Sequence, residues 1–202
     1  TSFDEMHTLP RDLRARLEAE LRLGSLEVVR EVRSSDGETK KFALRLADGQ
    51  VIETVLMRYE GVRRTACISS QAGCAMGCVF CATGQMGFAR HLSAGEIVEQ
   101  ALTVARDLEA QGERLSNVVM MGMGEPFHNY DNVLEAVRRL MDEDGLNIGQ
   151  RHITVSTVGL VPAIRRFADE GLQVRLAISL HAATDEERSA LLPVNRRYPI
   201  KD

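Results

Sequence analysis

Tryptophan is absent from this 202-residue chain, and aromatic residues make up only 4% of it. No apolar run approaches the roughly 20 residues that a membrane-spanning helix requires, so we expect no contact with a membrane. The start of the chain, Thr1 to Asp4, lacks the basic and apolar regions of a secretory leader. We therefore expect a cytoplasmic protein. Internal repeats and low-complexity tracts are also absent, which excludes the repeat architectures.

Lysine is scarce, because only Lys40, Lys41 and Lys201 contribute to the 25 basic residues. The others are arginines, whose planar fork suits phosphates and stacked bases, although a bias in genomic base composition would produce the same excess. The net charge of −4 argues against a strongly basic nucleic-acid-binding surface. Composition alone therefore does not predict an RNA-binding protein.

Cysteine occurs four times, and all four residues lie in one short stretch: Cys67, Cys74, Cys78 and Cys81. A secreted domain held by disulfides distributes its cysteines along the chain so that they join distant segments. Clustered cysteines instead indicate metal or redox chemistry in a reducing compartment.

Residues 1–62 predict a small accessory region. Pro10 begins a short helix with leucines on one face. Three strands follow, separated by Asp-Gly pairs that are typical of hairpin turns, and they form an antiparallel meander. We expect these strands at residues 26–32, 41–46 and 51–57.

Residues 63–202 alternate between strands and helices. Four strands each followed by a helix imply a parallel sheet with right-handed crossovers. A closed barrel needs more units, so the sequence predicts an α/β fold: a truncated, partial (β/α) barrel with a small N-terminal α+β accessory region. We expect the strands at 65–69, 117–121, 153–156 and 174–179, and the helices behind Ser93, over 130–141, from Pro162 to Gly171 and behind Thr184.

Cys74, Cys78 and Cys81 form a CxxxCxxC motif directly after the first strand of this alternating region. Thiolates bind zinc and iron–sulfur clusters alike, but a structural zinc site needs four ligands. Three thiolates leave one iron of a [4Fe–4S] cluster open to S-adenosylmethionine (SAM), which then supplies a 5′-deoxyadenosyl radical. The alternative is a zinc knuckle with Cys67 or a histidine as fourth ligand. The position of the loop at the mouth of a barrel favours the cluster.

Small or polar groups follow the next three strands. Glycine lets the backbone approach a ligand closely, and a carboxylate accepts hydrogen bonds from the SAM amino group. A serine hydroxyl at a single strand end is usually only a helix cap. Small or polar groups at three consecutive strand ends, above a cluster loop, instead predict a SAM pocket. Its expected residues are Gly124, Glu125, Ser156, Ser179, Leu180 and His181.

These motifs, in this order, resemble the RlmN/Cfr family of radical-SAM RNA adenine methyltransferases over about residues 51 to 200. The resemblance implies a core of radical-SAM type and methylation of adenosine C2 in large-subunit rRNA and in tRNA. It also implies an electron donor such as flavodoxin or ferredoxin. In radical-SAM enzymes an aromatic residue at the position of Phe80 packs on the adenine of SAM, and simple core packing is the alternative.

The family's mechanism gives roles to two further residues. Adenine C2 cannot attack the SAM methyl group as a nucleophile, so the family first moves the methyl group to a C-terminal cysteine and then activates it with the radical. A carboxylate removes the C2 proton, and a second cysteine releases the product through a disulfide. By position, Cys67 matches this second cysteine and Glu53 matches the base, with Glu60 as the competing carboxylate.

Two departures from the family pattern affect the expected activity. No cysteine follows Cys81, and the family's later asparagine at the SAM site is not present. We therefore expect the chain by itself to bind a cluster without turning over. The alternatives are a Cfr-type enzyme acting at adenine C8 and a non-catalytic, zinc-stabilised RNA-binding module.

Overall fold

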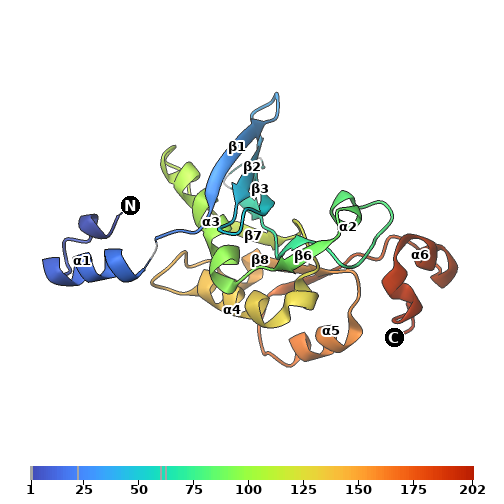
Figure 1. Cartoon of the computed structure of the whole chain (residues 1–202). Coiled ribbons are helices and arrows are strands. Elements are labelled where there is room, and N and C mark those ends of the chain that lie inside the picture. The colour runs from blue at the N-terminus through green and yellow to red at the C-terminus, as the bar shows by residue number, and fades with distance from the viewer. Residues whose placement is uncertain (1, 22, 60, 62) are drawn as a thin grey trace.

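The computed structural model describes residues 2–21, 23–59, 61 and 63–202. Its centre is a seven-stranded sheet whose first three pairings are antiparallel and whose last three are parallel (Figure 1). The predicted α/β class, a partial (β/α) barrel, is confirmed. The strands lie in the order β1 (Glu27–Arg33), β2 (Thr39–Arg45), β3 (Val51–Arg58), β4 (Arg64–Cys67), β7 (Asn117–Met120), β8 (Ile153–Thr157) and β9 (Arg175–Ile178).

The predicted meander is β1 to β3, and its two turns place Gly37 and Gly49 at φ values of 77° and 85°. Glycine adopts this left-handed conformation without a steric penalty, which is why Asp-Gly turns predict hairpins. The meander continues into the main sheet, because β3 pairs with β4. The predicted domain boundary falls at residue 62, which lies outside the described residues, and the division into two domains stays a prediction.

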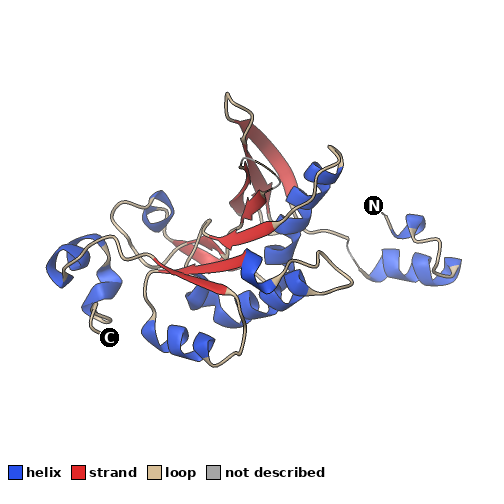
Figure 2. Cartoon of the chain, turned by 180° about the vertical axis from the view of Figure 1, so that it is seen from behind, coloured by secondary structure: helices blue, strands red, loops and turns tan. Residues whose placement is uncertain are grey.

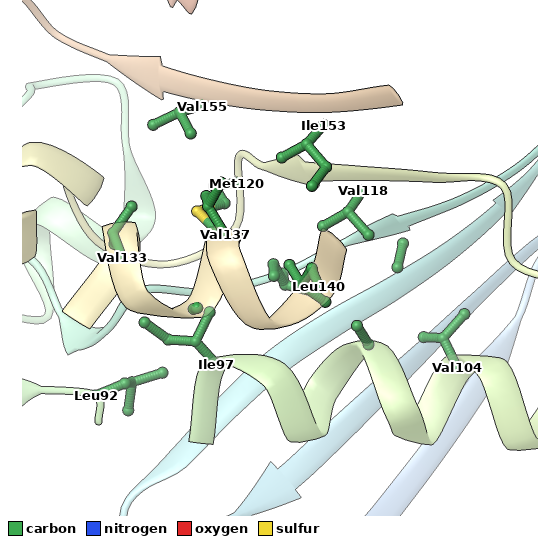
Figure 3. Close-up of a cluster of buried hydrophobic side chains, with 14 of the residues drawn as sticks. Leu92, Ile97, Val104, Val118, Met120, Val133, Val137, Leu140, Ile153 and Val155 are labelled. Atoms are coloured by element: carbon green, nitrogen blue, oxygen red, sulfur yellow. The ribbon is translucent and has the colours of Figure 1, made fainter. Parts of the chain in front are cut away.

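Two long helices, α3 (Ala94–Glu109) and α4 (Tyr130–Met141), cover one face of the sheet. Helix α3 begins at the predicted capping box, in which Ser93 and Glu96 bond each other's backbone N–H groups. Figure 3 shows side chains of α3 and α4 packed on those of β7 and β8. The buried core between the layers includes Leu92, Ile97, Val104, Val118, Met120, Val133, Val137, Leu140, Ile153 and Val155.

Of the last two helices, the first is shorter than the sequence pattern predicts and the second agrees with it. Helix α5 (Val161–Ala168) was expected to continue to Gly171, but it ends at Ala168, and only then does Gly171 turn the chain with φ 68°. Helix α6 (Asp185–Leu191) begins at Thr184, whose side chain accepts the Glu187 N–H as predicted. In the view from behind, α5 and α6 lie on the same side of the molecule as the C-terminus, opposite the N-terminus (Figure 2).

The sequence patterns did not predict the small hairpin that encloses the cysteines. Strands β5 (Gln71–Gly73) and β6 (Phe88–His91) pair antiparallel, and the short helix α2 (Ala82–Gln85) lies between them. A strand of three residues is too short to show alternating hydrophobicity. Gly73 closes this hairpin, because a Cβ there would lie 2.0 Å from the Gly87 carbonyl oxygen.

Helix α1 (Arg11–Glu20) lies away from the sheet, beside the short 3-10 helix at Phe3–Glu5 (Figure 1). None of its residues is buried, and the predicted leucine face includes the exposed Leu13 and Leu21. Among the described residues, no helix is long and apolar enough to span a bilayer.

The core side of α4 should dominate stability. We expect Leu140→Ala, at a fully buried position, to lower the free energy of unfolding by about 2–5 kcal/mol. The same substitution at Leu13 should change it by no more than about 0.5 kcal/mol, since that side chain packs on no core. Urea denaturation followed by circular dichroism measures both. Equal losses would contradict this description of the core.

Candidate cofactor site at the strand ends

The cysteine loop, residues 74–81, connects β5 to α2 and carries three free thiols. Cys74 and Cys78 are buried, while Cys81 is partly exposed and precedes α2. Burial raises the pKa of Cys74, and it raises the pKa of Cys78 to about 11, with further increases from neighbouring anions at Cys74 and Cys81. The three sulfurs are therefore close enough to act on one another. The raised pKa values of Cys74 and Cys78 favour the protonated thiols until a positive charge compensates the thiolates.

Three neighbouring thiols suit an iron–sulfur cluster better than a single ion. Within the described part of the chain, no three His, Cys, Asp or Glu side chains form a group that holds one metal ion. A [4Fe–4S] cluster binds each thiolate at a different iron, so its ligands do not need to converge on one point. The donor set of the loop therefore fits this cluster.

A cavity of about 610 Å³ opens beside the loop, at the carboxyl ends of β7, β8 and β9. We call it the strand-end pocket. Parallel strands bring their carboxyl ends to one edge of the sheet, which is where α/β folds bind ligands. All six predicted pocket residues line it: Gly124, Glu125, Ser156, Ser179, Leu180 and His181.

Glu125 is buried, with 2% of its surface exposed. One carboxylate oxygen accepts the Phe127 N–H at 3.0 Å, and the other accepts the Val158 N–H at 2.9 Å. Burial raises the pKa of this carboxyl despite these hydrogen bonds. The group thus caps the 3-10 helix at Pro126–Asn129 and fixes the β8 loop, which the sequence did not predict. A carboxylate has about four acceptor positions, so capacity for a ligand amine remains.

Two rings join the cysteine loop to the pocket. The centroids of Phe80 and His181 lie 4.6 Å apart. Phe80 is 52% exposed, so it does not fill the core, and its packing on an adenine stays a prediction. His181 has φ 61°, an uncommon conformation for a residue other than glycine. Residues held in such conformations concentrate at functional sites.

The hydroxyls of Ser156 and Ser179 lie 3.3 Å apart on adjacent strands. Ser156 is on β8, and Ser179 directly follows β9. Both therefore offer hydrogen-bonding groups to the same part of the strand-end pocket.

Glu53 and Cys67 lie on one face of the sheet. Val55 pairs directly with Cys67, and Glu53 is two residues from Val55, so the three side chains share a side. The helices cover the opposite side, onto which Leu56 projects. Glu53 is half exposed and forms an ion pair with Lys41 at 2.7 Å. The competing Glu60 lies outside the described residues.

Cys67 ends β4 and is not part of the loop. Burial raises its pKa. Its pairing with Val55 places it on the sheet face that α3 and α4 do not cover, where Glu53 also lies.

Gln71 is a residue that sequence reasoning missed. Its side-chain oxygen accepts the Glu125 N–H at 2.8 Å, and its amide nitrogen contacts the Nδ1 atoms of His91 and His128 at 3.0 and 3.1 Å. It is fully buried on β5 and joins the cysteine hairpin to the turn at Gly124. Only its proximity to the cysteine motif was visible in the sequence.

Comparison with known proteins agrees with this site. The sequence model of the Radical SAM superfamily matches residues 68–202, and the chain belongs to this superfamily. Membership implies a [4Fe–4S] cluster and SAM as cofactors, as the loop and the strand-end pocket also indicate.

More particular similarities point to one branch. The chain is 59% identical over its whole length to dual-specificity RNA methyltransferase RlmN 1 of Myxococcus xanthus and covers 56% of that protein. It is 55% identical over 98% of its length to a probable RlmN of Chloroflexus aurantiacus, of which it covers 54%. The resemblance to the RlmN/Cfr family is thereby confirmed. The chain spans about half the length of the curated relatives it matches.

A solved structure shares the fold. The crystal structure of a radical SAM methyltransferase from Sphaerobacter thermophilus superposes with a TM-score of 0.96 at 55% identity. The alignment covers 100% of this chain and 59% of the other. The strand order described above is therefore that of a radical SAM methyltransferase.

The close contact between Gly124 and Gln71 is testable. Gly124 has φ 99°, and a Cβ there would lie 2.5 Å from the Gln71 Cβ and 2.8 Å from its backbone nitrogen. Gly37 has φ 77° with nothing within 4 Å. We expect Gly37→Ala to cost about 1–2 kcal/mol from the backbone alone and Gly124→Ala to cost more, as measured by urea denaturation. Equal costs would contradict the close packing of the turn.

Proposed function

We propose that the protein containing this chain methylates C2 of an adenosine in large-subunit rRNA and in tRNA by radical-SAM chemistry. The observation that carries the proposal is the contact between the cysteine loop and the strand-end pocket. The Gln71 side chain, from the hairpin that carries the loop, accepts the Glu125 N–H at 2.8 Å, and Phe80 of the loop contacts His181. A ligand in the pocket therefore lies beside the three thiols. The dual-specificity name of the relatives supports two RNA substrates.

The three thiols would hold the cluster, and the strand-end pocket would hold SAM. When bound together, these groups supply an electron and a 5′-deoxyadenosyl radical. Glu125 would accept the SAM amino group, and Ser156 and Ser179 would bind its polar groups beside the two strands. Phe80, half exposed next to His181, would pack on the adenine of SAM.

Glu53 and Cys67 would act on the RNA base. Glu53, paired with Lys41 at 2.7 Å, would remove the C2 proton. Cys67, on the same face, would form the disulfide that releases the product. Because no cysteine follows Cys81, the methyl-accepting cysteine would come from another part of the protein. An electron donor such as flavodoxin or ferredoxin and a cytoplasmic location complete the proposal.

Iron content tests the cofactor assignment. Anaerobically reconstituted protein should hold about four irons per chain, and Ala at Cys74, Cys78 or Cys81 should abolish this. Cys67→Ala is the matched control, because Cys67 lies on β4 and should leave the iron content unchanged. Iron and sulfide analysis with an absorption spectrum measures each. Stoichiometric zinc without iron would favour the zinc-stabilised module instead.

Covalent trapping tests the role of Cys67. In the full-length protein that contains this chain, Cys67→Ala should keep the iron and SAM cleavage but stall with RNA attached, because no thiol remains to form the releasing disulfide. A denaturing gel should then show a shifted band that nuclease removes. Turnover at the wild-type rate by this variant would sink the assignment.

A further inference from the structure

Arg188, on α6, is a buried cation that the proposed chemistry does not use. Only 3% of it is exposed. Its guanidinium donates to the carbonyl oxygens of Val158, Leu180 and Tyr198 and to the side-chain oxygen of Asn195. Among the described residues, no carboxylate lies within ion-pair distance of it. The five donors of this side chain are thus used almost entirely on neutral backbone groups.

Two of these acceptors belong to the wall of the strand-end pocket. Val158 follows β8 and Leu180 follows β9, and both line the cavity. Val158 is held from two sides, because its N–H donates to Glu125 at 2.9 Å while its carbonyl accepts from Arg188. Leu180 immediately precedes His181 with its φ of 61°. Beyond the backbone bond from the Ser179 N–H to the Thr157 carbonyl, Arg188 therefore joins the segments that follow the two strands, at Val158 and Leu180.

The segment that carries Arg188 also contacts the cysteine loop. The carbonyl of Leu191 accepts the Val79 N–H at 3.1 Å. Gly77 lies beside Pro193, at the start of the 3-10 helix Pro193–Arg196, where a Cβ on Gly77 would be in ordinary van der Waals contact with the proline ring at 3.8 Å. One short segment thus touches the loop at one end and the pocket wall, through Arg188, at the other.

The energetics indicate why an arginine occupies this position. Burying a charge without a counter-charge is unfavourable unless every donor is satisfied. Lysine has a single nitrogen at its tip and cannot reach carbonyls on three segments at once. An arginine is therefore needed at this position to hold the three segments together.

We propose that Arg188 is a positioning residue that sets the geometry of the SAM pocket relative to the cysteine loop. The inference rests on the proposed function, because it takes SAM as the occupant of the strand-end pocket. The inference goes beyond the proposed function because it assigns the alignment of the pocket with the loop to one side chain that touches neither SAM nor the thiols.

The test compares Arg188→Lys with the wild type in the anaerobically reconstituted full-length protein that contains this chain. Iron content and melting temperature should stay near wild type, because the thiols are local to their loop. SAM affinity should fall by at least about tenfold, because a displaced pocket wall loses on the order of one charge-assisted hydrogen bond to SAM. The change that SAM causes in the electron paramagnetic resonance spectrum of the reduced cluster should weaken as well. Arg196→Lys, an exposed change in the same segment, is the control and should alter neither.

Chemical rescue provides a second measurement. Millimolar guanidinium should restore part of the SAM affinity of Arg188→Ala, whereas sodium chloride at the same concentration should not. Unchanged SAM affinity in a folded Arg188→Lys variant would overturn the inference, and so would joint loss of iron and melting temperature without rescue of Arg188→Ala. Failure of the wild type itself to bind SAM would instead overturn the proposed function.

Discussion

The parallel pairing of β4, β7, β8 and β9 is the constraint on which the site depends. Because these strands run in one direction, their carboxyl ends meet at one edge of the sheet. Segments far apart in the sequence, such as the turn at Glu125 and the loop at Ser179, therefore line one pocket. The cysteine loop follows the first of these strands and reaches the same edge. Without the parallel register the motifs would be unrelated in space.

Burial at this edge of the sheet favours the neutral forms of the acidic side chains. Burial raises the pKa of Glu125 and of the buried thiols Cys74 and Cys78, and the negative charge of Glu125 raises the pKa of both thiols further. Adding anions here without compensation is therefore unfavourable. Binding of a metal cofactor to such thiols must release their protons, so its affinity increases with pH. The donor set thus selects for a partner that brings positive charge.

The sequence was sufficient for the larger elements because their signals are local. The capping box at Ser93, the apolar stripe of α4 and the Asp-Gly turns each specify an element by themselves. The hairpin of β5 and β6 was missed, since three-residue strands carry no periodicity. The six residues of the pocket could be predicted because each lies in the last part of a strand or shortly after it, but the partners of Glu125 could not. Those depend on Val158, which only tertiary folding brings near.

The unpredicted residues share a physical role. Gln71, Gln100 and Arg188 are buried polar side chains that satisfy backbone groups of turns near the strand ends. Such turns cannot form regular pairs, and an unsatisfied buried N–H or C=O costs about 1–3 kcal/mol. Side chains must therefore supply the missing partners, and amides and guanidinium do so with the most donors and acceptors. The functional edge is thus held by buried hydrogen bonds, while the apolar core beneath α3 and α4 supplies the stability that permits it.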